Sequence, residues 1–134
     1  MSNEQEVERY LQRFAKERGF EFVLFYHAEY DSLQKTMELW SSAAIVVGPH
    51  GGAFANIAFA PKGTLVMEFL PNGSIFHSPA FKEHLSTYQQ AMALGHRYYP
   101  IMSTYVKNDD MVVNVRDVLS TLEKALGKEK KHLK

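Results

Sequence analysis

The sequence predicts an α/β domain built on a mainly parallel sheet of about four strands. Segments whose apolar residues recur at helical spacing alternate with short apolar strands, which is typical of chains that form parallel sheets. One of these strands, residues 44–47, is apolar throughout, as expected where helices cover both faces of the sheet. No linker, repeat or low-complexity stretch divides the 134 residues, so we expect a single domain.

The composition excludes several classes of function. Lys and Arg number 15 and Asp and Glu number 15, so no net charge attracts the chain to nucleic acid or to an anionic membrane. Cysteine is absent, which excludes disulfides, a thiolate nucleophile and a cysteine-based zinc site. The polar N-terminus does not resemble a signal peptide, and no apolar run approaches the roughly 18 residues of a membrane span. We therefore expect a soluble domain without a membrane segment.

The first element is a helix over residues 4–18. Asn3, followed three residues later by Glu6, has the pattern of a capping box, and Gly19 is a C-terminal stop. The apolar residues at helical spacing are Val7, Tyr10, Leu11 and Phe14.

Residues 20–26 are rich in aromatic and branched side chains, which predicts a strand. Asp31 or Ser32 caps a second helix, and residues 44–47 form the apolar strand described above. The inner face of the second helix carries Leu33, Met37 and Trp40.

A glycine-rich turn over residues 48–52 follows the apolar strand, and a helix of small residues extends from about Ala53 to Ala58. Residues 61–63 form a turn that leads into another buried strand, residues 64–69.

Ser78 and Pro79 supply the N-cap and the first-turn proline of a helix that Gly95 ends. Residues 97–102 predict a weaker strand at the edge of the sheet, because Pro100 has no N–H to donate.

Asn114 caps a last helix that ends at Gly127. We therefore place the domain over residues 1–127 and a frayed, lysine-rich tail over residues 128–134.

The turn over residues 48–52 is the best candidate for a binding site. In open α/β sheets ligands bind beyond the carboxyl ends of the strands, and N–H groups at a helix N-terminus attract anions. His50 can donate to a phosphate, and Asn56 can brace the turn by a hydrogen bond to its backbone. The alternative is a tight turn without a ligand, since the dinucleotide fingerprint and the P-loop lysine-serine pair are both missing.

Glu68 lies in an otherwise apolar strand, level with the glycine-rich turn. Burying an ionised carboxylate is costly unless it has a partner. Two partners fit: the hydroxyl pair of a ribose, or a salt bridge to Lys62, Arg97 or another basic residue. No carboxylate completes a metal site around His77 and His84, so we expect no metal.

Residues 43–59, together with residues 61–64 and 66–71, resemble the catalytic domain of glycosyltransferase family 61. The shared features are a strand, a Gly-x-His-Gly turn with Asn56 beyond it, a proline-glycine turn, and a strand that carries Glu68. The Ala-Gly pair that follows His-Gly in the family is Gly52-Ala53 in this sequence. Residues 94–99 are similar to a later strand of that family, so the resemblance covers roughly residues 3–101. The family includes β-1,2-xylosyltransferases and O-linked N-acetylglucosaminyltransferases that act on EGF domains.

The resemblance implies the C-terminal, Rossmann-like half of a GT-B enzyme, without the first strand of that half. Such an enzyme transfers a sugar from a UDP donor to a glycan or protein hydroxyl, inverts the anomeric centre and requires no metal. Glu68 would hold the ribose hydroxyls. The catalytic base would lie in the missing half, so no catalytic residue is named and the chain alone is expected to be inactive. The candidate donor-binding residues are His50, Gly51, Gly52, Ala53, Phe54 and Asn56.

The missing strand would lie between residues 20–26 and residues 44–47. Those two segments therefore pair directly, or a second copy of the chain fills the gap in a homodimer. A different function is also open, that of a non-catalytic nucleotide-binding or interaction module, whereas a dinucleotide oxidoreductase is disfavoured. The family places eukaryotic members in the ER or Golgi, but the sequence carries no targeting segment.

Overall fold

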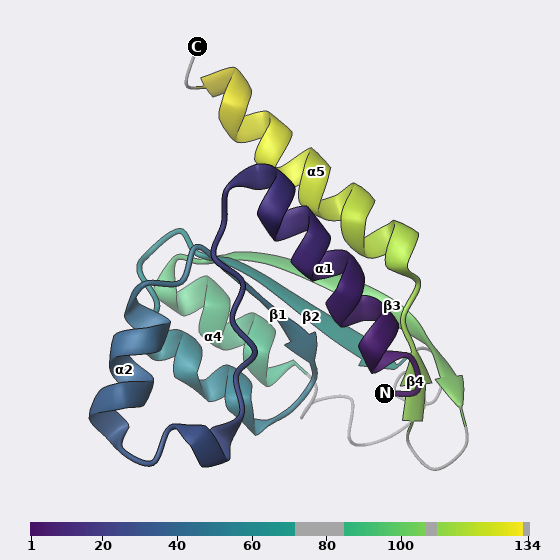
Figure 1. Cartoon of the computed structure of the whole chain (residues 1–134). Coiled ribbons are helices and arrows are strands. Elements are labelled where there is room, and N and C mark those ends of the chain that lie inside the picture. The colour runs from purple at the N-terminus through teal and green to yellow at the C-terminus, as the bar shows by residue number, and fades with distance from the viewer. Residues whose placement is uncertain (72–84, 107–109, 133–134) are drawn as a thin grey trace.

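The computed structural model describes residues 1–71, 85–106 and 110–132, and shows three layers around one four-stranded sheet (Figure 1). The helices α1 and α5 cover one face of the sheet, and α2, η2 and α4 cover the other. The elements are α1 (Glu4–Arg18), η1 (His27–Glu29), α2 (Leu33–Ser41), β1 (Ile45–Pro49), η2 (Gly52–Phe59), β2 (Leu65–Pro71), α4 (Ser86–Leu94), β3 (Arg97–Val106), β4 (Asp110–Val112) and α5 (Val115–His132).

The strands are ordered β1-β2-β3-β4. β1 pairs with β2 and β2 with β3 in parallel, while β4 pairs with β3 in antiparallel fashion. This arrangement confirms the predicted α/β class with a mainly parallel sheet. β2 is the central buried strand, and its residues alternate between the two faces.

Each face of the sheet has its own apolar core. The core under α1 and α5 includes Val7, Phe14, Leu65, Met67, Phe69, Ile101, Val118 and Leu122. The core under α2, η2 and α4 comprises Trp40, Phe54, Ile57, Val66 and Ala91. Glu68 is two residues beyond Val66 in β2, so it lies on the same face as this second, smaller core.

The strand predicted over residues 20–26 does not form. These residues have no regular secondary structure, and they connect the α1 layer to the α2 layer. Phe20 packs against the first core and Phe25 against the second, so the segment must pass from one face of the sheet to the other. Its local preference for a strand finds no partner among the described residues, and β1 is the edge strand of the described sheet.

Pro100 lies in β3, which has a strand on each side and is therefore not at the edge of the sheet. The prediction of an edge strand was therefore wrong for β3 as a whole. Around Pro100 itself the prediction holds, because β4 pairs only with residues 104–106. Among the described strands, only β2 lies beside Pro100.

Several predicted helix ends are confirmed. The Ser32 hydroxyl accepts a hydrogen bond from the Lys35 N–H in α2. Gly19 and Gly95 adopt the left-handed backbone conformation at the C-termini of α1 and α4. The Asn114 side chain accepts from the Arg116 N–H at the start of α5. Ser78 and Pro79, predicted to begin a helix, lie outside the described residues.

Two predicted helix ends were wrong. α5 continues through Gly127 to His132, since a glycine inside a helix costs only about 1 kcal/mol and the residues that follow favour helix. Asn3 makes no side-chain cap for α1.

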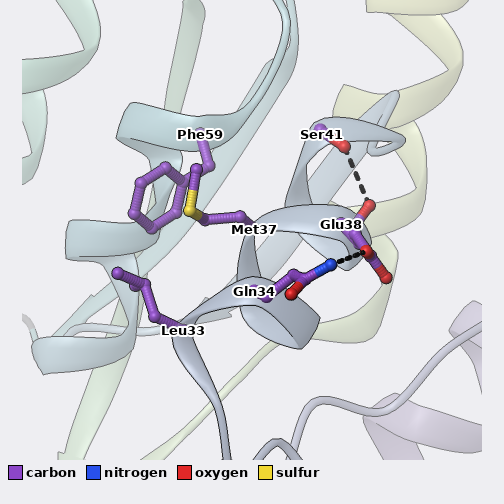
Figure 2. A pocket seen from close by; sticks show the side chains of 6 residues that line it. All are labelled: Leu33, Gln34, Met37, Glu38, Ser41 and Phe59. Atoms are coloured by element: carbon purple, nitrogen blue, oxygen red, sulfur yellow. Dashed lines mark hydrogen bonds between the residues drawn. The ribbon is translucent and has the colours of Figure 1, made fainter.

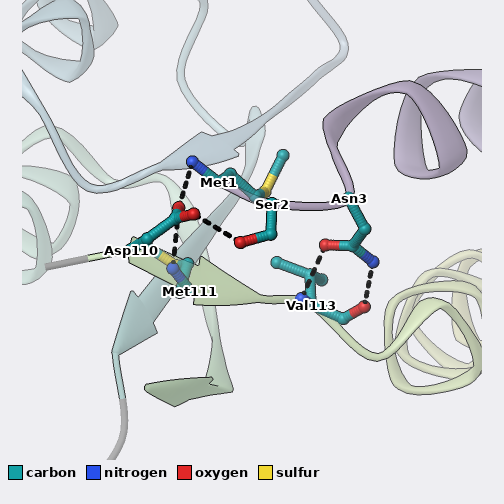
Figure 3. A network of polar contacts seen from close by, with 6 residues as sticks. All are labelled: Met1, Ser2, Asn3, Asp110, Met111 and Val113. Atoms are coloured by element: carbon teal, nitrogen blue, oxygen red, sulfur yellow. Dashed lines mark hydrogen bonds and ion pairs between the residues drawn. The ribbon is translucent and has the colours of Figure 1, made fainter. Parts of the chain in front are cut away.

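Asn3 instead binds the residue that follows β4 (Figure 3). Its amide nitrogen donates to the Val113 carbonyl at 2.7 Å, and its amide oxygen accepts from the Val113 N–H at 3.0 Å. The Ser2 N–H donates to the Met111 carbonyl at 2.9 Å, and the Met1 ammonium lies 2.6 Å from an Asp110 oxygen. These contacts join the N-terminal residues to β4.

Candidate functional site

The glycine-rich turn joins the carboxyl end of β1 to η2. The His50 N–H donates to the Phe69 carbonyl at 3.0 Å, which extends the pairing of β1 with β2 by one residue. The first hydrogen bond of η2 runs from the Phe54 N–H to the Gly51 carbonyl at 3.2 Å. η2 is a 3₁₀ helix of eight residues, longer than most helices of that type.

Three successive N–H groups, those of Gly51, Gly52 and Ala53, lie between these two hydrogen bonds. All three residues are exposed, and none of the three groups donates to another part of the described chain. Three exposed donors at the N-terminus of a helix can bind an anion.

The two glycines of this group are not required by the backbone or by packing. Neither lies in the left-handed backbone region, since Gly51 is extended with φ 169° and ψ 174°. A Cβ built on Gly52 meets no atom within 4 Å, and one on Gly51 meets only the Pro49 carbonyl oxygen at 3.9 Å. The space beside both residues is therefore open.

Asn56 and Phe54 hold the turn from within the chain. The Asn56 side chain donates to the Ala53 carbonyl at 3.1 Å, so it contacts the backbone of η2 immediately after the turn and not residues 48–52 themselves. Phe54 is only 4% exposed and packs in the second core, close to Gly48. Its side chain therefore anchors the turn and does not face a ligand.

Glu68 is fully buried, and both oxygens of its carboxylate have protein partners. Oε2 lies 2.7 Å from Nδ1 of His50, and Oε1 accepts a hydrogen bond from the Tyr98 hydroxyl at 2.5 Å. The partner is thus neither Lys62 nor Arg97. A ribose contact by Glu68 remains a prediction, and it would require the fully buried carboxylate to become accessible.

The electrostatics of this group favour a neutral tyrosine. Burial raises the pKa of Tyr98 well above its usual value, and the hydrogen bond to Glu68 and the charge of Glu68 raise that pKa further. The phenol therefore keeps its proton and remains a hydrogen-bond donor. Its ring also packs edge-on against Tyr88, with 5.5 Å between the ring centroids.

The contribution of Tyr98 was not predicted, because an aromatic residue in an apolar strand is usually a core residue. The signal that could have revealed it is the register: Tyr98 in β3 lies opposite Val66, and Val66 and Glu68 are on the same face of β2.

A family model for glycosyltransferase 61 matches residues 1–67, which is half of the chain. The chain belongs to glycosyltransferase family 61. The search of curated proteins found no match. The matched range includes the whole turn from Gly48 to Asn56 and ends one residue before Glu68.

Two further observations concern the described part of this family 61 chain. Within the described residues, no three His, Asp or Glu side chains are grouped so that they could hold a metal ion. No helix in the described part is both long enough and apolar enough to cross a membrane. His77 and His84 lie outside the described residues.

A second surface feature is a shallow groove between α2 and η2 (Figure 2). Leu33, Met37 and Phe59 line its apolar side, and Leu33 is 67% exposed. On the other side, the Gln34 amide donates to the Glu38 carboxylate at 3.1 Å.

Proposed function

We propose that this chain binds the diphosphate of a UDP-sugar donor at the turn between β1 and η2. The observation that carries this proposal is the row of exposed N–H groups of Gly51, Gly52 and Ala53, which is open on the outside. Membership of a glycosyltransferase family makes a nucleotide-sugar the fitting ligand.

The chemistry of the turn suits a diphosphate. Backbone N–H groups can donate to phosphate oxygens without a counter-ion, and the N-terminal end of η2 adds a favourable dipole. Glu68 holds Nδ1 of His50 at 2.7 Å, which fixes the imidazole at the turn where we place the phosphate. Asn56 fixes the carbonyl of Ala53 and so limits the movement of the turn.

During transfer, negative charge develops on the leaving diphosphate. We infer that the N–H groups and His50 stabilise this charge and that the reaction inverts the anomeric centre without a required metal. The transferred sugar is one such as N-acetylglucosamine or xylose, and its acceptor is a hydroxyl of a glycan or protein. The acceptor site and the catalytic base lie outside this chain, which is then inactive alone.

A non-catalytic nucleotide-binding module is the second candidate. The interaction of His50 with Glu68 favours it, because Nδ1 of that histidine is committed to holding the side chain in place. Both candidates bind a nucleotide, but only the first prefers a uridine diphosphate.

Calorimetric titration with UDP, ADP and NAD separates these functions. The donor-site proposal predicts that UDP binds more tightly than the other two and that His50→Ala weakens this binding. Equal binding of all three ligands supports the module. If none of the three ligands binds, both nucleotide-binding proposals are contradicted. Sugar transfer by this chain alone would contradict the statement that the catalytic base lies elsewhere.

A further inference from the structure

Three side chains from neighbouring strands are joined beneath the turn. His50 follows β1, Glu68 lies in β2 and Tyr98 lies in β3. The Glu68 carboxylate joins the other two residues, at 2.7 Å from the imidazole and 2.5 Å from the phenol oxygen.

Glu68 cannot act directly on a ligand in this arrangement. Its side chain is fully buried, and it shares a sheet face with Val66 and the apolar residues of the second core. Each of its two oxygens already has a partner. Its effect on a ligand must therefore pass through one of these partners, and of the two only His50 belongs to the turn.

Tyr98 determines which oxygen is left for His50. Because the phenol stays protonated, its hydroxyl donates to Oε1 and leaves Oε2 as the acceptor for the imidazole. A carboxylate oxygen accepts hydrogen bonds, so we take Nδ1 as the donor to Oε2 in this contact. The tautomer and the orientation of the imidazole follow from this contact.

We infer that Tyr98 and Glu68 are positioning residues, which act through one another to hold the His50 imidazole, with its proton on Nδ1, in the turn that we assign to the donor diphosphate. The part of this inference that concerns the diphosphate rests on the proposed function. The part that concerns the imidazole rests only on the contacts of the three side chains.

Tyr98→Phe and Glu68→Gln test the inference. The first removes the hydroxyl and keeps the ring that packs against Tyr88. The second keeps an acceptor but adds an NH₂ group, which can donate to Nδ1 and so favours the other tautomer. Tyr99→Phe is the matched control, because Tyr99 is the next residue of β3 and packs against the core on the opposite face.

The first readout is the ¹⁵N NMR spectrum of the histidine side chains, in which the His50 signals are those lost in His50→Ala. The wild type and Tyr99→Phe are expected to show the Nδ1–H tautomer. Glu68→Gln is expected to shift His50 toward Nε2–H, because the Tyr98 hydroxyl donates to the amide oxygen and leaves the NH₂ group for Nδ1. Tyr98→Phe is expected to keep the Nδ1–H tautomer, since its Glu68 carboxylate still accepts from the imidazole.

The second readout is the affinity for UDP, measured by calorimetry. We expect it to fall about three- to tenfold in Tyr98→Phe and more in Glu68→Gln, with no change in Tyr99→Phe. An unchanged tautomer in Glu68→Gln, or an unchanged UDP affinity in both test variants, would overturn the inference and leave a purely structural role for the three side chains. If wild-type UDP binding is absent, the donor-site proposal fails, while the tautomer in Glu68→Gln still decides whether Glu68 orients His50.

Discussion

Replacing Gly52 with alanine tests whether the turn after β1 holds a glycine for folding or for access to a ligand. Gly52 does not adopt the left-handed backbone region, and a Cβ built on it meets no atom within 4 Å. We therefore expect the free energy of unfolding to stay within about 0.5 kcal/mol of wild type, or to rise slightly because alanine restricts the unfolded chain.

The effect on binding has the opposite sign. The added methyl group enters the open space beside the N–H groups of Gly52 and Ala53, where we place the diphosphate. A hydrogen bond to a charged group contributes about 1.5–3 kcal/mol, so the loss of one such bond weakens UDP binding roughly 10- to 150-fold.

The assay combines calorimetric titration with UDP and unfolding in urea. Gly127→Ala is the matched control, since Gly127 lies in α5 and a Cβ there also meets no atom within 4 Å. Alanine at this helix position should raise stability by about 1 kcal/mol and leave UDP binding unchanged. If Gly52→Ala binds UDP as tightly as the wild type, the diphosphate does not lie on these N–H groups. If the variant unfolds, the glycine is structural.

Three further predictions concern pH and association. The pKa of Tyr98 is higher in the folded chain than in the unfolded chain, so its contribution to stability is present below pH ~10 and falls above it. The urea midpoint should therefore decline less steeply with rising alkaline pH in Tyr98→Phe than in wild type. Equal slopes in the two proteins would refute this. Hydrogen bonds from the Met1 ammonium, then Ser2 and the Met111 N–H, lower the pKa of Asp110 to about 2. A ¹³C NMR titration of the Asp110 carboxyl should show its midpoint near that pH, and Ser2→Ala should raise the midpoint. An ordinary wild-type midpoint near 4 would contradict the contacts. The open edge of β1 predicts a homodimer in sedimentation experiments and a monomer after Ala44→Lys, so a wild-type chain that stays monomeric at high concentration argues against edge pairing.

The sequence predicted the fold class well because apolar periodicity and turn residues act locally. The parallel strands β1, β2 and β3 and the ends of α1 and α4 follow from such local signals. Residues 20–26 show the limit of this reasoning. Their side chains favour a strand, but a strand needs a partner, and no local signal reveals that the partner is missing.

The sequence did not predict β4, the fourth strand of the sheet. β4 has only three residues, and its place depends on contacts with β3 and with the N-terminal residues, about 110 positions away in the sequence. Asn3 illustrates the same point, because its side chain pairs with Val113 and does not cap α1.

The candidate site was predicted in part. The exposed turn and a backbone contact of the Asn56 side chain could be inferred from residue types at fixed spacing. The need of Glu68 for a partner was also clear, since a buried carboxylate is costly. Its partners, however, are 18 and 30 positions away in the sequence, and only the register of the sheet brings them together.

The contacts between the N-terminal residues and β4 have a practical consequence for handling the protein. The Met1 ammonium binds Asp110, which pairs with Val106 at the carboxyl end of β3. Because β1, β2 and β3 are parallel, this is the same edge of the sheet at which β1 ends (Figure 1). An affinity tag fused to Met1 would remove that ammonium and crowd the end of the molecule where nucleotides are to be titrated. α5 ends at His132 at the opposite end of the molecule, so a purification tag or a surface-immobilisation handle belongs after this helix (Figure 1).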